Sequence, residues 1–446
     1  MKSYILNTLD DIRSSYWFIP LVMAIIAAAL SYVGIRVDSA IGDTAPEWLG
    51  WLFDNQPEGA RAVLSTIAGS MVTVGGVVFS ITLVSVSNAA FQFGPRLLTT
   101  FMRDRSNQVT LGTFTATFLY CLLVLRAVQS APANASDEMA SEFVPHVALL
   151  GAIGLAICSI GVLIYFIHHV PQSIHVSRLV AGIGGELCSQ LDERFPTPLG
   201  EGSKTSDREA LEEKLSDGRA IRVRKSGYIR IIDGDSLIAL ATKYDLMIEL
   251  LCLPGGFITS GDAAMRVVGL EAHEDCDAIE DELRAVVALG AMRTPIQDAG
   301  FLAEELSEIA LRALSPGVND PHTAITAMHW MGAALTLLGE REDLSSVRRD
   351  ENDEPRVLAP VDGFDNLMRA SLWRVLPFAA RNVTAGEQLV AMTEHLRARL
   401  GEERRKQLDD LMECFFEIAR ENLTAEEVKY LTAKAKTCRE KAPERV

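Results

Sequence analysis

Four long apolar stretches dominate the first part of the chain. Each is close to or above the ~20 residues that a helix needs to cross a hydrocarbon core. Continuous runs such as Leu21–Leu30 do not alternate like barrel strands, and lipid offers no hydrogen-bond partner to an unpaired backbone amide. The pattern therefore predicts a four-helix transmembrane domain at residues 17–170, with spans at Trp17–Val37, Ala62–Ala89, Val109–Val128 and Pro145–Val170.

Amphipathic and polar segments flank these stretches. Residues 1–16 place Ile5, Leu9, Ile12 and Tyr16 on one helical face, which predicts an amphipathic helix in the membrane interface. Residues 171–219 are predicted to form a helical connector and linker, because the helical pattern continues until prolines interrupt it in the segment 195–202.

The remaining chain divides into a strand-rich and a helical part. Short apolar runs between glycine-containing turns predict a small β-rich module at residues 220–270, interrupted by a short helix at Asp235–Thr242. Its strands are expected at Ala220–Arg224, Tyr228–Ile232, Met247–Leu251 and Met265–Val268. Residues 271–446 have a helical period and predict a helical domain, in which the polar segment 340–362 is expected to be an exposed loop. Capping boxes are expected at Thr384 with Glu387 and at Thr424 with Glu427.

Lysine and arginine in the short flanks indicate the orientation of the spans. The segment before the first span, the second loop and the exit from the fourth span are basic, whereas the centres of the first and third loops are acidic or neutral. The basic residues are Lys2, Arg13, Arg96, Arg103, Arg105 and Arg178. Both termini are therefore expected to be cytoplasmic. The predicted fold class is a membrane α-helical protein with a cytoplasmic α+β domain, which holds the small β-rich module and a C-terminal helical bundle.

Composition narrows the classes of function. The net charge of -17 argues against a nucleic-acid partner, because phosphate attraction supplies most non-specific binding energy there. Seven cysteines are scattered without a C-x-x-C pair, which predicts neither a disulfide framework nor a zinc site. No catalytic triad, metal-ligand set or phosphate loop is recognisable. We therefore expect no enzyme activity, no metal and no cofactor, and membrane lipid as the general partner.

The second apolar stretch carries a face of small and hydroxylated residues. Projection at about 100° per residue gathers Thr66, Gly69, Ser70, Thr73, Gly76, Ser80 and Ser87 on this face, and Phe91 continues it toward the cytoplasmic end. Such a stripe would suit a water-filled path between subunits, with Phe91 as part of a hydrophobic gate. The alternative is that small residues only let helices approach closely while hydroxyls bond across the contact. No formal charge lies inside this span.

A second motif lies in the soluble part, at Ala313–Ala324. Ser315-Pro316-Gly317 is expected to end one helix, and Asp320 to cap the next helix with Pro321 in its first position. A helix N-terminus is also a ready anion site. The hypothesis is a ligand pocket formed by Arg293, Asp298, Asn319, Asp320, His322 and Thr323, and the alternative is a purely structural turn.

The densest basic cluster of the soluble part lies just before and within the first predicted strand. It consists of Arg219, Arg222, Arg224 and Lys225. These side chains would face anionic headgroups or the linking helix, or else pair with acidic residues nearby such as Glu209, Glu212 and Glu213.

Three groups of motifs resemble one known family. They are Thr294–Asp298 with Ala310–Ala324, then Phe79–Val84 with Phe93–Leu98, and finally Ser226–Asp233 with Leu253–Phe257. Together they are similar to the bacterial membrane family catalogued as domain of unknown function 2254. Gly256 departs from the acidic residue expected after Pro-Gly. The resemblance implies a four-span N-terminal region and a cytoplasmic domain, and it brings no established activity or catalytic residues. The expected location is the bacterial inner membrane.

Two functions are compatible with these features. The first is a homo-oligomeric, channel-like pore whose second spans face one another and whose cytoplasmic domain is regulatory. The second is a non-conducting signalling or scaffold protein, in which the spans only anchor a domain that binds a ligand or a partner.

Overall fold

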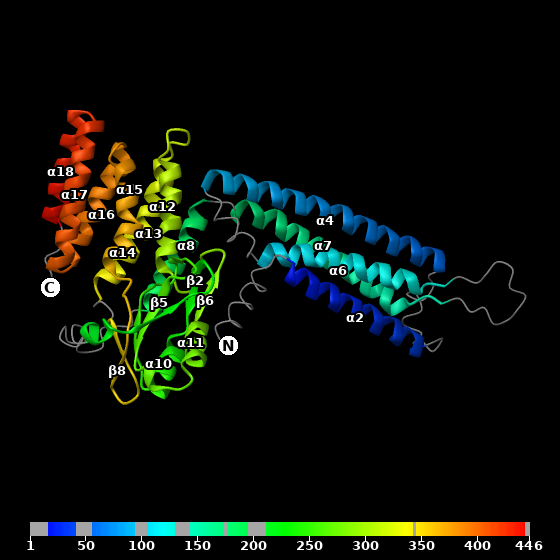
Figure 1. The fold of residues 1–446 in the computed structure, drawn as a ribbon. Helices are drawn as coiled ribbons and strands as arrows, with labels where there is room; N and C mark the ends of the chain where they lie inside the picture. Colours follow the sequence, from blue (N-terminus) through cyan, green and yellow to red (C-terminus); the bar gives the residue numbers. More distant parts are fainter. Residues whose placement is uncertain are drawn as a thin grey trace, which may run out of the picture. The chain divides into compact units, whose positions relative to one another are not determined.

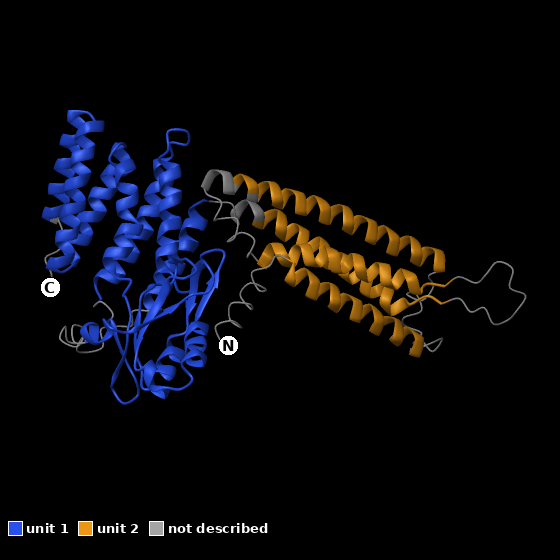
Figure 2. Ribbon diagram, viewed as in Figure 1, with its two compact units in different colours: residues 1–10, 176–446 blue, residues 11–175 orange. Residues whose placement is uncertain are grey.

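The computed structural model describes residues 17–41, 56–93, 105–129, 143–173, 176–194, 211–341 and 345–441 (Figure 1). They belong to two compact units, one within residues 11–175 and one within residues 176–446 (Figure 2). The border between the units coincides with the end of the fourth apolar stretch. The predicted fold class, four apolar helices followed by an α+β region, is confirmed.

Four long helices build the first unit. They are α2 (Phe18–Ile41), α4 (Pro57–Phe93), α6 (Arg105–Ala127) and α7 (His146–Ser173). All four are long and apolar enough to cross a membrane. The helix α6 packs against the other three and is the most buried of the four. Gly112 of α6 allows Pro20 and Met23 of α2 to come close, as small residues do in membrane helices.

Polar side chains close the helix ends of this unit. The carboxylate of Asp38, in the last turns of α2, accepts hydrogen bonds from the backbone N–H groups of Val147 and Ala148 at 2.8 and 3.0 Å. Arg61, near the start of α4, donates to the carbonyl oxygen of Val128 at 3.0 Å, just beyond α6. Helix ends carry unpaired backbone groups, and these contacts satisfy several of them without water. Each cap therefore also fixes two helices to one another.

Two small sheets form the strand-rich part of the second unit. The larger has the order β1-β5-β3-β8-β7 and the smaller β4-β2-β6. The pairing is antiparallel except between β3 and β8. The strands are β1 (Arg219–Arg222), β2 (Gly227–Ile232), β3 (Met247–Leu250), β4 (Phe257–Ile258), β5 (Ala263–Val268), β6 (Val287–Gly290), β7 (Val347–Arg349) and β8 (Pro355–Leu358).

One apolar core joins both sheets to the helices α10 (Gly234–Lys243) and α11 (Cys276–Ala285). Ile229, Leu237, Ile248 and Leu283 are among its buried members, and the short 3-10 helix η2 (Leu270–Ala272) adds Leu270. Strands of two to six residues cannot form a stable fold alone, so this shared core is what holds them. All four predicted strands and the helix inserted between them are present.

The segment 340–362 was predicted to be an exposed loop, and that prediction is wrong for the hairpin β7–β8. The charged side chains of this hairpin pair with one another and with distant residues. Asp350 accepts from Arg356 at 2.9 Å, and Arg356 also bonds Asp245 at 2.6 Å. Because these ion pairs neutralise the charges, β8 can pair with β3 and extend the sheet. The strand-rich region therefore recruits β6, β7 and β8 from beyond residue 270.

Helices form the remainder of the second unit. They are α8 (Val176–Arg194), α12 (Ala299–Ala313), α13 (Pro321–Gly339), α14 (Phe364–Ala370), α15 (Leu372–Ala379), α16 (Val383–Arg399), α17 (Glu402–Asn422) and α18 (Ala425–Lys441). The helix α8 packs on α12 and α13, where Gly184 leaves room for the Trp330 ring. A Cβ at Gly184 would overlap that ring.

The last helix, α18, is attached by one apolar anchor and two ion pairs. Leu431 is fully buried beside Gly386 of α16. Lys434 donates to Glu387 at 2.6 Å, and Arg439 makes two hydrogen bonds to Glu394, whose side chain is only 2% exposed. The attachment therefore combines a buried apolar side chain with two ion pairs.

The two predicted capping boxes had different outcomes. Thr424 and Glu427 exchange reciprocal hydrogen bonds before α18, which confirms that capping box. At Thr384 the prediction is wrong. Asn382 caps α16 through the backbone N–H groups of Thr384 and Ala385, and the Glu387 carboxylate is held by Lys434.

We expect Asp38→Ala to destabilise the first unit by about 1–2 kcal/mol, the range for loss of a helix cap. The expected readout is a lower temperature of unfolding in detergent. Ser39→Ala is the matched control, since the Ser39 hydroxyl only donates to Arg36 of its own helix. Equal stability of Asp38→Ala and Ser39→Ala would contradict the capping role of Asp38.

We expect Arg439→Met to loosen α18, because Glu394 would remain buried without a cation. The expected cost is about 1–3 kcal/mol, the range for an unsatisfied buried polar group. Hydrogen exchange of the α18 amides measures this loss. The double variant Arg439→Met with Glu394→Met should recover part of the protection, since no charge is then stranded. Protection unchanged in Arg439→Met would exclude an electrostatic attachment.

Candidate functional site

The predicted pore residues lie on the side of α4 that turns away from its own bundle. The buried positions of α4 recur every three or four residues, at Ala60, Leu64, Ala68, Met71, Gly75, Val78 and Thr82. The exposed positions include Thr66, Gly69, Ser70, Thr73, Gly76, Ser80 and Ser87. At about 100° per residue these two sets fall on opposite sides of the helix. The side chain of Phe91 lies outside the described residues.

Gly69 and Gly76 of this face do not serve packing among the residues that the structure describes. A Cβ added at Gly69 or Gly76 would meet no atom within 4 Å, whereas one at Gly75 would lie 3.3 Å from Phe114 of α6. Close helix approach within the bundle therefore depends on Gly75 and not on the predicted stripe. The stripe is left to face lipid or another polypeptide.

Hydroxyl groups on this face repeat at steps of seven residues. Thr66, Thr73, Ser80 and Ser87 form one row, and Gly69 and Gly76 form a second row with the same step. A seven-residue step keeps one seam in contact when two helices wind around each other with a left-handed twist. The face was predicted from its small and hydroxylated residues, and the repeat, which was not predicted, is readable from residue spacing alone.

Two of the hydroxyls on this face already have acceptors. Thr66 donates to the carbonyl oxygen of Ala62 at 2.7 Å, and Thr73 to that of Gly69 at 3.0 Å. Their donor capacity is thus satisfied within α4. What they still offer to a neighbour or to water is the acceptor capacity of the oxygen.

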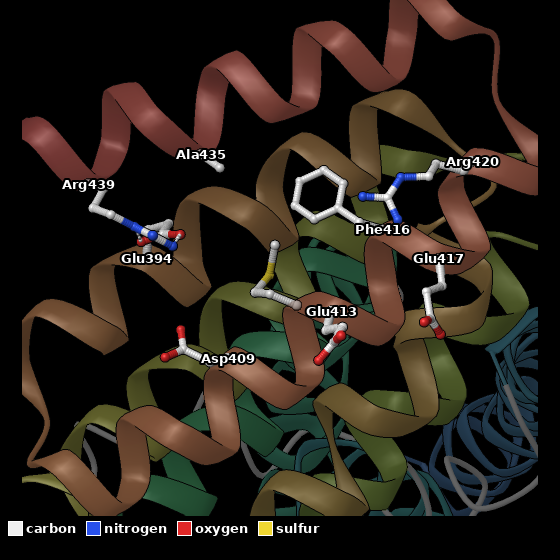
Figure 3. Close-up of a pocket in the computed structure, with 9 residues that line it drawn as sticks. Glu394, Asp409, Glu413, Phe416, Glu417, Arg420, Ala435 and Arg439 are labelled. Atoms are coloured by element: carbon white, nitrogen blue, oxygen red, sulfur yellow. Dashed lines mark hydrogen bonds and ion pairs between the residues drawn. The ribbon is translucent and has the colours of Figure 1, made fainter.

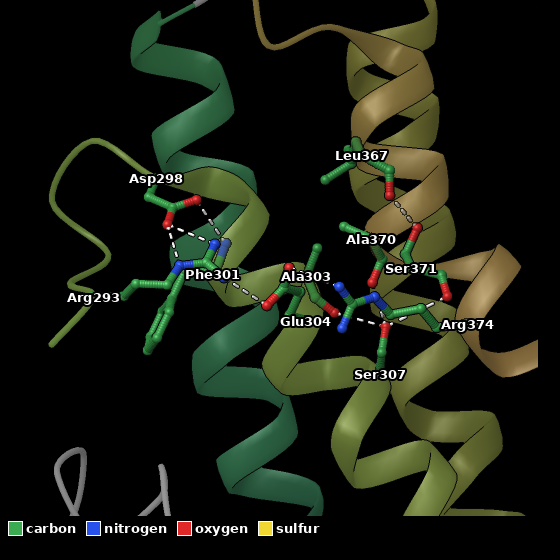
Figure 4. A network of polar contacts seen from close by, with 10 residues as sticks. All are labelled: Arg293, Asp298, Phe301, Ala303, Glu304, Ser307, Leu367, Ala370, Ser371 and Arg374. Atoms are coloured by element: carbon green, nitrogen blue, oxygen red, sulfur yellow. Dashed lines mark hydrogen bonds and ion pairs between the residues drawn. The ribbon is translucent and has the colours of Figure 1, made fainter. Parts of the chain in front are cut away.

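The most elaborate polar centre of the second unit surrounds Arg293 (Figure 4). Its guanidinium makes hydrogen bonds of 2.9 and 2.7 Å to one oxygen of Asp298 and one of 2.7 Å to Glu304. Arg374 of α15 bonds the other Glu304 oxygen at 2.9 Å. Burial raises the pKa of the Asp298 carboxyl, although the Arg293 cation opposes the shift. Burial also disfavours the Arg293 cation, but Asp298 and Glu304 outweigh it and raise its pKa.

Residues of the motif Thr294–Asp298 connect three further segments to this centre. The Gln297 side chain accepts from the Ile232 N–H at 2.8 Å and donates to the Ile232 carbonyl oxygen at 3.2 Å, which holds the end of β2. Asp298 accepts from the Phe301 N–H and caps α12. Gly255 has a φ of +88° and lies so close to Asp298 that a Cβ would overlap the carboxylate. The motif therefore has a structural role at each of these positions.

The six residues of the predicted ligand pocket do not come together. Asp298 caps the start of α12, whereas Asp320 caps α13 after α12 has ended. The 15 residues of α12 separate the two caps by about 22 Å at 1.5 Å per residue. The structure therefore does not bring these six residues into a single pocket, because the whole of α12 lies between the two halves.

The second half of that predicted pocket follows the structural alternative. Asp320 accepts from the Thr323 N–H at 3.2 Å and from the Thr323 hydroxyl at 2.6 Å, and this hydroxyl lowers the pKa of Asp320. Asn319 has a φ of +50°, which suits the turn before the helix. His322 is exposed. These contacts account for a helix cap without a ligand.

One hollow in the C-terminal helices was not predicted. It has a volume of about 280 Å³ and lies among α16, α17 and α18 (Figure 3). Its lining combines acidic, basic and apolar side chains, namely Glu394, Asp409, Met412, Glu413, Phe416, Glu417, Arg420, Ala435 and Arg439. Asp409, Glu413 and Glu417 are four residues apart on α17, a spacing that would have revealed one wall of it. Among the described residues no cluster of histidine, cysteine and carboxylate side chains is arranged to hold a metal ion.

We expect Arg293→Met to destabilise the second unit by about 3 kcal/mol at neutral pH, since it strands the buried Asp298 carboxylate. The pKa of Asp298 should rise further without the cation. A raised pKa means that the folded state prefers the neutral acid, so the stability it contributes is present at low pH and is lost as pH rises through the folded pKa. The deficit of the variant should therefore shrink as pH falls toward the ordinary value of 3.8.

Chemical denaturation at several pH values measures this deficit. Arg374→Met is the matched control, because the Arg374 side chain is 51% exposed and its loss leaves Glu304 paired with Arg293. A deficit that is the same at every pH would show that Asp298 is not the group responsible.

Comparison with known proteins assigns the chain to a family. The family model described as predicted membrane protein (DUF2254) matches residues 13–395. Similar relatives include uncharacterised proteins of Mycobacterium bovis and of Mycobacterium tuberculosis, each 30% identical over 388 residues that cover 84% of this chain and 70% of the relative. No solved structure matches the chain. The chain therefore belongs to the family of predicted membrane proteins designated domain of unknown function 2254.

Proposed function

We propose that the protein is a homo-oligomeric, channel-like pore of the bacterial inner membrane, with both termini in the cytoplasm. In this assembly α4 of each copy lines the path. The observation that carries the proposal is the outward stripe of α4, whose small and hydroxylated residues are not used by the chain's own bundle.

The packed interior of a single bundle argues against a path through one copy. It favours a path that forms between several copies. Leu64, Cys121, Val124 and Ala152 fill the centre of the four helices and are fully buried. An outward face can enclose water only if several copies turn it toward a common axis. The seven-residue step of the hydroxyl row suits such parallel neighbours.

The absence of charge along α4 limits what such a path would select. From Ala62 to Phe93 the helix has no Asp, Glu, Lys or Arg. A path lined by hydroxyl groups and backbone would discriminate weakly by charge and mainly by size and hydration. We therefore propose a weakly selective conduit and not a proton-coupled transporter, which would need ionisable groups in the spans.

A regulatory role of the second unit is supported by chain connectivity. Only residues 174 and 175 separate α7 from α8. The helix α8 is in turn packed against α12 and α13. A change in that helical layer would therefore reach the last span through a very short link. We propose no catalytic role, since the carboxylates of the Arg293 centre are engaged in ion pairs.

One observation favours the second candidate, a non-conducting scaffold that only anchors its soluble unit. The Thr66 and Thr73 hydroxyls donate to their own helix and so tolerate lipid. Val72, Val77 and Leu83 are also exposed on α4 and would suit a lipid-facing surface. Under this reading the stripe would contact acyl chains and no current would flow.

We expect purified protein in planar bilayers to pass current, and Thr73→Phe to abolish it by filling the path. Val72→Phe is the matched control, because Val72 is exposed on the flank of α4 outside the stripe. It should leave the current unchanged. No current across voltage, membrane tension and candidate solutes would favour the scaffold, and equal effects of both phenylalanines would exclude α4 as the lining helix.

A further inference from the structure

An apolar patch lies exposed at one end of the three-stranded sheet. Phe257 is 61% exposed and Met292 69%, and both lie outside the spans. The Tyr228 ring lies against Phe257 edge to face, with ring centres 5.0 Å apart. We call Tyr228, Phe257 and Met292 the sheet-end patch. Side chains of this size are rarely grouped on a surface that only meets water.

Strand register explains why these residues share one place. Tyr228 of β2 is paired with Phe257 of β4 on one side and with Gly290 of β6 on the other. Met292 follows β6 by two residues, so it lies at the end of the sheet where β2 begins. Ile229 and Ile258 on the opposite face are buried in the core. Tyr228 and Phe257 are thus held on the sheet itself, and Met292 lies just beyond its end.

Basic residues adjoin the patch. The segment 222–226 is bound to the segment 259–262, since Gly261 donates to Val223 at 2.9 Å and the Ser260 hydroxyl donates to the Arg224 carbonyl oxygen at 3.0 Å. This places Arg222, Arg224 and Lys225, all exposed, beside the turn that follows β4, the strand that carries Phe257. Arg224 forms an ion pair with Asp281, and Arg219 of the predicted basic cluster forms one with Glu280. The rim remains cationic on a chain of net charge -17.

We propose that the sheet-end patch docks on the anionic lipid surface of the membrane that the chain itself spans. Large apolar side chains would enter the headgroup region while Arg222 and Lys225 meet lipid phosphates. The two-residue link between α7 and α8 keeps the second unit at the membrane, so the local concentration of lipid headgroups is always high. A second copy docked patch to patch is a poorer occupant, because the cationic rims of the two copies would then face each other. The inference does not depend on whether the spans conduct.

Hydrogen exchange of the full-length protein in lipid nanodiscs tests this docking. One set of discs contains phosphatidylcholine alone, and the other contains about one third phosphatidylglycerol. We expect the amides of segments 222–228 and 256–262 to exchange more slowly in the anionic discs, on the order of tenfold for one or two cationic contacts. High salt should remove the difference.

A matched pair of variants separates docking from general effects of lipid. The double variant Phe257→Ser with Met292→Ser should lose the slowing, and both side chains are exposed, so the fold is expected to remain intact. Val318→Ser removes another exposed apolar side chain, remote in sequence from the patch, and should keep the slowing. Equal exchange in both kinds of disc would overturn the proposal. So would slowing that appears only when two copies share a disc, because that result would identify a second copy as the occupant.

Discussion

Every polar group of the backbone that enters lipid has to find its partner within the protein, and this constraint shapes the first unit. Along the four helices the requirement is met by the helices themselves. At their ends it is met by side chains of neighbouring helices, as with Asp38 at the start of α7 and Arg61 at the end of α6. The charged residues near the membrane are therefore part of the packing. Once these helix ends are capped, α6 can pack at the centre of the bundle. One face of α4 then has no packing partner among the described residues.

The second unit follows the same rule with different means. Several of its buried charges are paired, as in the Arg293 centre and in the attachment of α18 through Glu394. Its recognisable family motif, Thr294–Asp298, ties β2, the turn at Gly255 and α12 together. A motif of this kind does not by itself mark a catalytic site. The hollow lined by α17 and α18 lies largely beyond residue 395, where the match to the family ends.

Local features of the chain were predictable, and distant pairings were not. Span length, the strands β1, β2, β3 and β5 and the cap at Asp320 follow from hydrophobic period and turn chemistry within a few residues. The strand β8 escaped prediction because its charges are neutralised by partners such as Asp245, over 100 residues away. The composition of α4 revealed its stripe but not the direction in which it points. The direction depends on Gly75 packing against α6, which only the assembled bundle shows.

The position of β8 in the larger sheet has a consequence for biosynthesis. One edge of β3 (Met247–Leu250) stays uncovered until β8 (Pro355–Leu358) has been synthesised and can pair with it. Pairings across such a long stretch of chain form slowly, because the entropy cost of closing the loop comes before the stabilisation that the contact provides. By the time the ribosome has made residue 358, the four apolar helices have long been translated. The emerging soluble part thus completes its folding beside a bilayer, with an open strand edge that chaperones would have to shield until the hairpin arrives.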